Sequence, residues 1–203
     1  MRQLIIVPIV HGEEDTGSLR AEVDRAFRRR LGKYKLDAHK RAIRDFWSRV
    51  GQLVQERDFD AASVLIYQDG LPVCGRELEM VRELAASGSQ NHQIVANMVD
   101  RGASIVGTED PSLIVQELQR IKKQISARPH APRRAAPSSR AAIAKSLEPR
   151  DRFIAARIDQ TLNHGQIGLL FIGLMHDVRP HLPADIEVEY LIEPTAVLQM
   201  TAS

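Results

Sequence analysis

The chain has 203 residues, of which 43% are hydrophobic and 27% are charged, a composition typical of a globular protein with one sizeable core. No apolar run approaches the roughly 18–20 residues needed to cross a membrane, and the first residues lack the pattern of a signal peptide. Cys74 is the one cysteine, which excludes an intrachain disulfide framework. We therefore expect a cytoplasmic protein that does not enter the membrane.

The net charge of +2 is unevenly distributed. Residues 127–145 contain five arginines and lysines, three prolines and no acidic residue, which leaves the rest of the chain at −3. This composition predicts a basic mobile loop within a single domain that spans residues 1–203. The alternative is an arm that binds an acidic partner, such as a nucleic acid.

The hydrophobic pattern alternates between strands and helices along the whole chain. Short apolar runs predict strands at residues 3–10, 61–67, 102–106, 167–174 and 186–191, the last at an edge of the sheet. Helical spacing predicts helices at residues 18–31, 36–58, 75–86, 91–101 and 147–163, with another that begins at Pro111. Residues 197–200 predict a last short strand or a frayed end. This alternation predicts a three-layer α/β fold, with a largely parallel sheet and helices on both faces.

Polar residues follow most of the predicted strands directly. His11 follows the first strand and His176 follows the strand at 167–174, and each is close to acidic residues. The polar residues just beyond the strands are His11, Glu13, Glu14, Asp15, Asp69, Glu77, Glu109, Asp110, His176 and Asp177. Because the carboxyl ends of parallel strands share one edge of the sheet, we expect a site there. The remaining histidines are expected at the surface, and they are His39, His92, His130, His164 and His181.

Two kinds of chemistry fit these side chains. Imidazole and carboxylate groups bind Zn, Mn or Fe, and the candidate ligands are His11, Glu13, His176 and Glu109. The same groups could serve as general acids and bases, and the candidate catalytic residues are His11, His176, Glu77 and Arg152. Arginines such as Arg150 and Arg152 could hold an anion or orient a carboxylate. Helix capping by Glu109 and Asp110, and a solvated loop at residues 13–15, are the structural alternatives.

Several well-known motifs are absent from the sequence. There is no Gly-x-Gly-x-x-Gly after a strand, no phosphate-binding Gly-x-x-x-x-Gly-Lys-Ser/Thr, no Gly-x-Ser-x-Gly and no Cys-x-x-Cys. These absences reduce the weight of the classical nucleotide-binding, serine hydrolase and zinc-ribbon interpretations.

Four short segments resemble a known superfamily. They are Pro8-Ile9-Val10-His11, an acid at Asp69, Glu77 or Glu79, the segment from Arg150 to Ile158, and Gly173-Leu174-Met175-His176. In this order they resemble the group that joins TraB proteins, TIKI metalloproteases, erythromycin-esterase-type hydrolases and haem-binding ChaN-like proteins. The resemblance implies a site built from these segments, and either hydrolysis or cofactor binding.

The predicted function is therefore hydrolysis of a small-molecule or peptide substrate, with a divalent metal as a candidate cofactor. The alternative is a non-catalytic protein of the same fold that binds or senses a small ligand or haem. A scaffold that acts through residues 127–145 is a third class, and the sequence leaves a homo-oligomer open.

Overall fold

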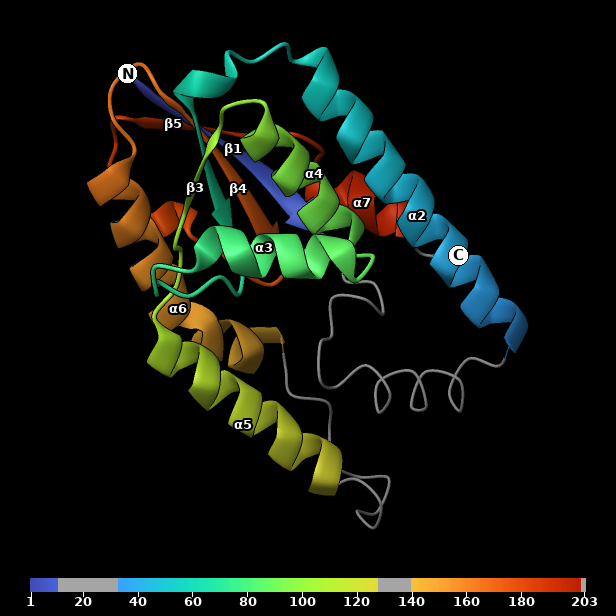
Figure 1. Cartoon of the computed structure of the whole chain (residues 1–203). Coiled ribbons are helices and arrows are strands. Elements are labelled where there is room, and N and C mark those ends of the chain that lie inside the picture. Colours follow the sequence, from blue (N-terminus) through green and yellow to red (C-terminus); the bar gives the residue numbers. More distant parts are fainter. Residues whose placement is uncertain (11–32, 128–139, 202–203) are drawn as a thin grey trace.

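The computed structural model describes residues 1–10, 33–127 and 140–201, and these residues form one parallel sheet with helices on both faces (Figure 1). The strands are β1 (Arg2–Ile9), β2 (Val64–Gln68), β3 (Ser104–Val106), β4 (Ile167–Gly173) and β5 (Ile186–Tyr190). Their order in the sheet is β3-β2-β4-β1-β5, and every neighbouring pair is parallel. The predicted three-layer α/β fold is confirmed.

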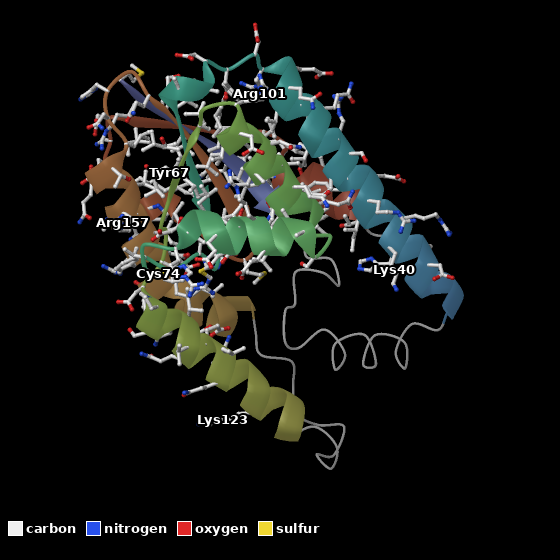
Figure 2. The ribbon with its side chains drawn as sticks, in the orientation of Figure 1. Lys40, Tyr67, Cys74, Arg101, Lys123 and Arg157 are labelled. Atoms are coloured by element: carbon white, nitrogen blue, oxygen red, sulfur yellow. The ribbon has the colours of Figure 1, made fainter. Side chains whose placement is uncertain are left out.

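The helices divide between the two faces of the sheet. One face carries α2 (Lys33–Glu56), α3 (Glu77–Ala86), α4 (Gln90–Asp100) and α7 (Pro194–Thr201). The other face carries α6 (Arg140–Thr161) and the short 3-10 turn η3 (Arg179–His181). Helix α5 (Pro111–Ala127) extends away from the sheet, and Lys123 on it lies far from the strands (Figure 2). None of the helices in the described ranges is both long enough and apolar enough to cross a bilayer.

The strands are apolar on both faces because both faces are covered, as expected for a parallel sheet. Ile5 and Val7 of β1 belong to the core beneath α2, α3, α4 and α7, and Trp47 of α2 is buried in that core. Leu4 and Ile6 belong to the core beneath α6. On that side, Tyr67 of β2 donates or accepts a hydrogen bond with Thr161 of α6 at 2.8 Å, and Figure 2 shows Tyr67 beside this helix.

The strand order creates a crevice between β2 and β4. These two strands are neighbours, but the chain continues from β2 outward to β3 and from β4 in the opposite direction to β5. The connections that leave their carboxyl ends therefore diverge. Such a switch point is where open α/β sheets place their ligands.

Pro8 lies inside β1, which is a central strand, although proline removes a hydrogen-bond donor from the sheet. Ile6 O accepts a hydrogen bond from Leu191 N at 2.8 Å, so the backbone polar groups of Ile6 face β5. Because the direction of these groups repeats every two residues along a strand, the nitrogen of Pro8 faces β5 as well. The pairing of β1 with β5 ends at Ile6 opposite Tyr190. Pro8 therefore lies just beyond the last partner on that side, and no sheet hydrogen bond is lost.

The structure differs from the sequence predictions in two segments. Residues 140–145, predicted to be part of a loop, are the start of α6, in agreement with the high helix propensity of their alanines. The last segment is a helix, α7, and neither a strand nor a frayed end. Pro194 suits the first turn of α7, where its missing N–H costs nothing. The predicted helix at 18–31 and residues 128–139 of the predicted loop lie outside the described residues.

Candidate functional site

The histidine that follows β4 is held by a carboxylate from α6. His176 Nδ1 lies 2.5 Å from Asp151 Oδ1, and the two side chains are only 5% and 6% exposed. The second oxygen of Asp151 accepts a hydrogen bond from Asp177 N at 3.1 Å. This arrangement fixes the imidazole ring, and with the proton on Nδ1 it leaves the lone pair on Nε2.

A second carboxylate, Asp69, links the ends of β2 and β4 to the middle of α6. It directly follows β2, and its Oδ2 accepts a hydrogen bond from Gly173 N, at the end of β4, at 3.0 Å. Its Oδ1 accepts from Arg150 Nη2 of α6 at 2.7 Å. The same Asp69 Oδ2 lies 3.7 Å from His176 Nε2, which is beyond hydrogen-bond distance.

Arg150 links Asp69 to a third, fully buried carboxylate. Arg150 Nε and Nη2 donate to the two oxygens of Glu109 at 2.5 and 2.6 Å, a bidentate pair. Glu109 Oε1 also accepts from Gly70 N at 2.6 Å, and Glu109 is 0% exposed. Arg150 therefore orients both carboxylates, which was one of the two roles predicted for it, and Glu109 does not cap α5.

The buried charges shift the pKa values of these groups. Burial alone lowers the pKa of His176, but the hydrogen bond to Asp151 and the negative charge of Asp69 outweigh burial, so the pKa is raised above its ordinary value of 6.5. Burial raises the pKa of Glu109, against the opposing effect of Arg150. The raised pKa means that a higher pH is needed to produce the neutral imidazole, which is the form that acts as a general base.

The groups lie at the wall of a cavity of about 580 Å³ at the carboxyl ends of β1, β2 and β4. The polar part of the wall includes Asp69, Arg150 and His176. Most of the rest is apolar, with contributions from Ile9 at the end of β1 and from Val10, Leu71, Met80, Leu84, Leu147 and Leu174. Such a cavity, apolar with a few convergent polar groups, is the usual form of a small-molecule site.

Of the six predicted site residues, the structure places one, His176, at the cavity. His11 and Glu13 lie outside the described residues, although Val10, which precedes them, lines the cavity. Glu109 lies behind Arg150, where both of its oxygens are occupied.

The other two predicted residues lie apart from the cavity wall. Glu77 accepts hydrogen bonds from Cys74 N and Gly75 N at the start of α3, and these donors outweigh partial burial and lower its pKa. Figure 2 shows Cys74 in this segment between β2 and α3. Arg152 points into solvent and pairs with Glu148 at 2.7 Å, with its side chain 65% exposed. Arg150, two residues earlier, takes the place at the site.

In the described part of the chain, no group of three or more histidine, cysteine, aspartate or glutamate side chains is arranged to hold a metal ion. Two of the four predicted ligands, His11 and Glu13, are not among the residues searched.

Asp151 and His92 are among the site residues that the sequence interpretation missed. Asp151 was given no role, although it falls on the buried stripe of its helix, three and seven residues before Ile154 and Ile158, where a lone acid needs a partner. His92 was expected at the surface, but it is 7% exposed, lines the cavity and lies 2.7 Å from Ser89 Oγ through Nδ1. His92 lies in the first turn of α4, just after the capping residue Ser89, and the hydrophobic pattern of the sequence does not indicate that this position faces the interior.

No family model matches the chain, and no curated protein or solved structure matches it either. The resemblance to the TraB and TIKI group stays a prediction based on the short motifs, and the site is interpreted from its own geometry.

Proposed function

We propose that this chain is a hydrolase in which His176 is the general base. The observation that carries the proposal is the Asp151–His176 pair, a buried imidazole held by a carboxylate at the wall of a cavity large enough for a small molecule. An aspartate that accepts from Nδ1 keeps the imidazole in the tautomer whose Nε2 can take a proton, and stabilises the imidazolium that results.

In the proposed reaction, His176 Nε2 removes a proton from a water molecule in the cavity. The hydroxide oxygen adds to the carbonyl carbon of the substrate, and the bond from that carbon to the leaving group then breaks. The imidazolium returns the proton to the leaving group, so the products are a carboxylic acid and the protonated leaving group. Asp151 orients the ring, while Arg150 holds Asp69 in place beside Nε2.

The test uses short-chain nitrophenyl esters, a set of dipeptides, and the variants His176→Asn and Asp151→Asn. His176→Asn keeps an N–H donor for Asp151 but removes the base, so we expect kcat/KM to fall by about 10²–10⁴-fold. His164→Asn, at an exposed histidine, is the matched control and should leave kcat/KM unchanged. Equal activity of His176→Asn and the wild type would overturn the proposed role of His176.

Metal dependence is a separate part of the proposal. A divalent ion would take His176 Nε2 as one ligand and would supply an activated water. Plasma mass spectrometry of the purified protein, after repletion with Zn, Mn and Fe, should find a near-stoichiometric metal that is lost from a His11→Ala/His176→Ala variant. Absence of metal from both proteins would leave hydrolysis by metal-free acid–base chemistry.

A second candidate function is ligand binding or sensing without turnover, and the largely apolar wall of the cavity favours it. The two functions differ in what His176→Ala removes. A hydrolase loses turnover, whereas a binding protein loses affinity and shows no turnover in the wild type.

A further inference from the structure

Two buried amide oxygens at the cavity have no hydrogen-bond partner. Within the described part of the chain, the buried side-chain polar atoms without a partner are Gln68 Oε1 and Asn91 Oδ1. Gln68 is 2% exposed and Asn91 is 1% exposed, and both residues line the cavity that contains His176. They come from different elements, since Gln68 ends β2 and Asn91 lies in the first turn of α4.

Buried acceptors of this kind are rare because they lose their hydrogen bonds to water and gain none in return. Because both oxygens belong to residues that line one cavity, they indicate a site whose polar contacts are completed by a ligand. Gln68 Nε2 lies 3.5 Å from Asp69 O, a long contact that assigns the amide nitrogen to that side and the oxygen to the other. The two oxygens accept hydrogen bonds, so the ligand must supply N–H or O–H donors.

We infer that the cavity selects carboxamides with an apolar body, whose N–H groups donate to Gln68 and Asn91. The inference rests on the proposed function, because it names the substrate class of the same cavity. A primary carboxamide has two N–H bonds, one for each oxygen, and its apolar part would contact Leu84, Leu147 and Leu174. In the reaction proposed above, the C–N bond would break, water would supply the hydroxyl group, and ammonia would leave with the proton from His176.

An ester of the same shape lacks the donors and would leave both oxygens unpaired. A site built to bind a polar substrate group discriminates strongly against analogues that lack it. With about tenfold for each hydrogen bond, we expect at least a tenfold preference for the amide.

The experiment measures binding of hexanamide and benzamide by ligand-observed NMR, each beside its N,N-dimethyl amide and its methyl ester. The proteins are the wild type, Asn91→Leu, Gln68→Met and the control Asn97→Leu, which changes an exposed asparagine of the same helix. We expect the wild type and Asn97→Leu to bind a primary amide at least tenfold more tightly than its two analogues. Asn91→Leu and Gln68→Met each remove one of the two acceptors, so in each variant the preference should fall by about tenfold.

The melting temperature of Asn91→Leu supplies a second readout, because a binding role and a purely structural role for Asn91 predict changes of opposite sign. Because Asn91→Leu removes an unpaired buried polar group, it should raise the melting temperature of the free protein by about 2–4 °C. A structural role for Asn91 predicts a fall.

The inference is overturned if neither primary amide binds, if amides and esters bind equally to the wild type, or if the preference survives in both variants. This failure differs from failure of the proposed hydrolase. Selective binding with no hydrolysis would keep the ligand class and reject the hydrolase. Hydrolysis that requires His176 but shows no preference for amides would keep the hydrolase and reject the ligand class.

Discussion

His176 is the residue on which the proposed function depends, and its proton affinity can be measured without a substrate. Its pKa is raised above 6.5 despite burial, because Asp151 and Asp69 favour the protonated ring. In an NMR titration of the imidazole nitrogens, we expect a midpoint above 6.5 in the wild type and a lower midpoint in Asp151→Asn. The opposite order of the two midpoints would show that Asp151 does not stabilise the charged ring.

The same pKa has two consequences for the pH dependence. A raised pKa in the folded state means that protonation of His176 stabilises the fold fully below the unfolded pKa near 6.5, and that this stabilisation is lost as the pH rises through the folded-state pKa. The rate of base catalysis depends on pH in the opposite sense: it rises with pH, because the neutral ring is the active form. We therefore expect kcat/KM to rise over the pH range in which the contribution of His176 to the free energy of unfolding falls.

Arg150 and Arg152 provide a matched pair of arginines on one helix. Arg150→Met leaves Glu109, which is 0% exposed, without its guanidinium, and we expect a loss of about 3–5 kcal/mol in the free energy of unfolding, measured by urea denaturation. Adding Glu109→Gln to this variant should recover part of the loss. Arg152→Met breaks an exposed pair with Glu148 and should change the stability little. Equal losses in the two single variants would contradict the central role of the buried pair.

Part of the site could be predicted from the sequence at this scale. A histidine directly after a buried strand marks a strand end, and this rule found His176. The same rule placed Asp69 among the polar residues just beyond the strands, and the superfamily resemblance gave it as one of three alternatives for the acid. The choice between Arg150 and Arg152 depends on the rotation of α6 about its own axis.

 In an α-helix, residues two positions apart point in directions about 200° apart, so that only one of these two arginines can face the sheet. The buried stripe of Ile154 and Ile158 contains Asp151 and therefore fixes that rotation, a signal the sequence interpretation did not use.

At the scale of the elements, the two strands that flank β4 approach it closely near its start, at Gly168. A Cβ atom added at Gly168 would lie 2.8 Å from Leu4 Cδ1 and 3.2 Å from Tyr67 Cε2, on the two flanking strands. We expect Gly168→Ala to lower the free energy of unfolding by about 1–3 kcal/mol in urea denaturation.

The control for this prediction is Gly51→Ala in α2. There the added Cβ would meet Ile94 at 3.7 Å, an ordinary contact, and alanine favours the helix by about 0.5–1 kcal/mol. Gly51→Ala should therefore stabilise the protein. A neutral Gly168→Ala would show that β4 has more room than the structure gives it.

The elements themselves were largely predictable, because hydrophobic period and turn residues act locally. All five described strands were predicted with their type, and Asp110 begins α5 as predicted, with its Oδ1 accepting from Ser112 N at 2.7 Å. Helix α7 was not, since a run of four residues such as 197–200 is too short to separate a strand period from a helix period. Tertiary contacts stabilise the helical conformation of this segment, because Val197 is fully buried in the core that α2 also lines.

At the scale of the whole molecule, the strand order decides which side chains meet. The order β3-β2-β4-β1-β5 brings Asp69, Arg150 and His176 together from positions up to 107 residues apart in the sequence. The sequence predicted a parallel sheet with polar groups at one edge, but it could not predict which strands are neighbours, because pairing depends on contacts between distant segments. Strand order does not separate Asp69 from Glu77, because both follow β2: Asp69 comes directly after the strand and lines the cavity, whereas Glu77 begins α3 and lies away from the cavity wall.

The most direct test of the account is the hydrolysis of carboxamides and esters by the wild type and by His176→Asn, measured side by side as kcat/KM. The account predicts hydrolysis by the wild type, and a loss of about 10²–10⁴-fold in His176→Asn with the fold intact by circular dichroism. The contradictory result is either no hydrolysis of any compound by the wild type or equal hydrolysis by the two proteins.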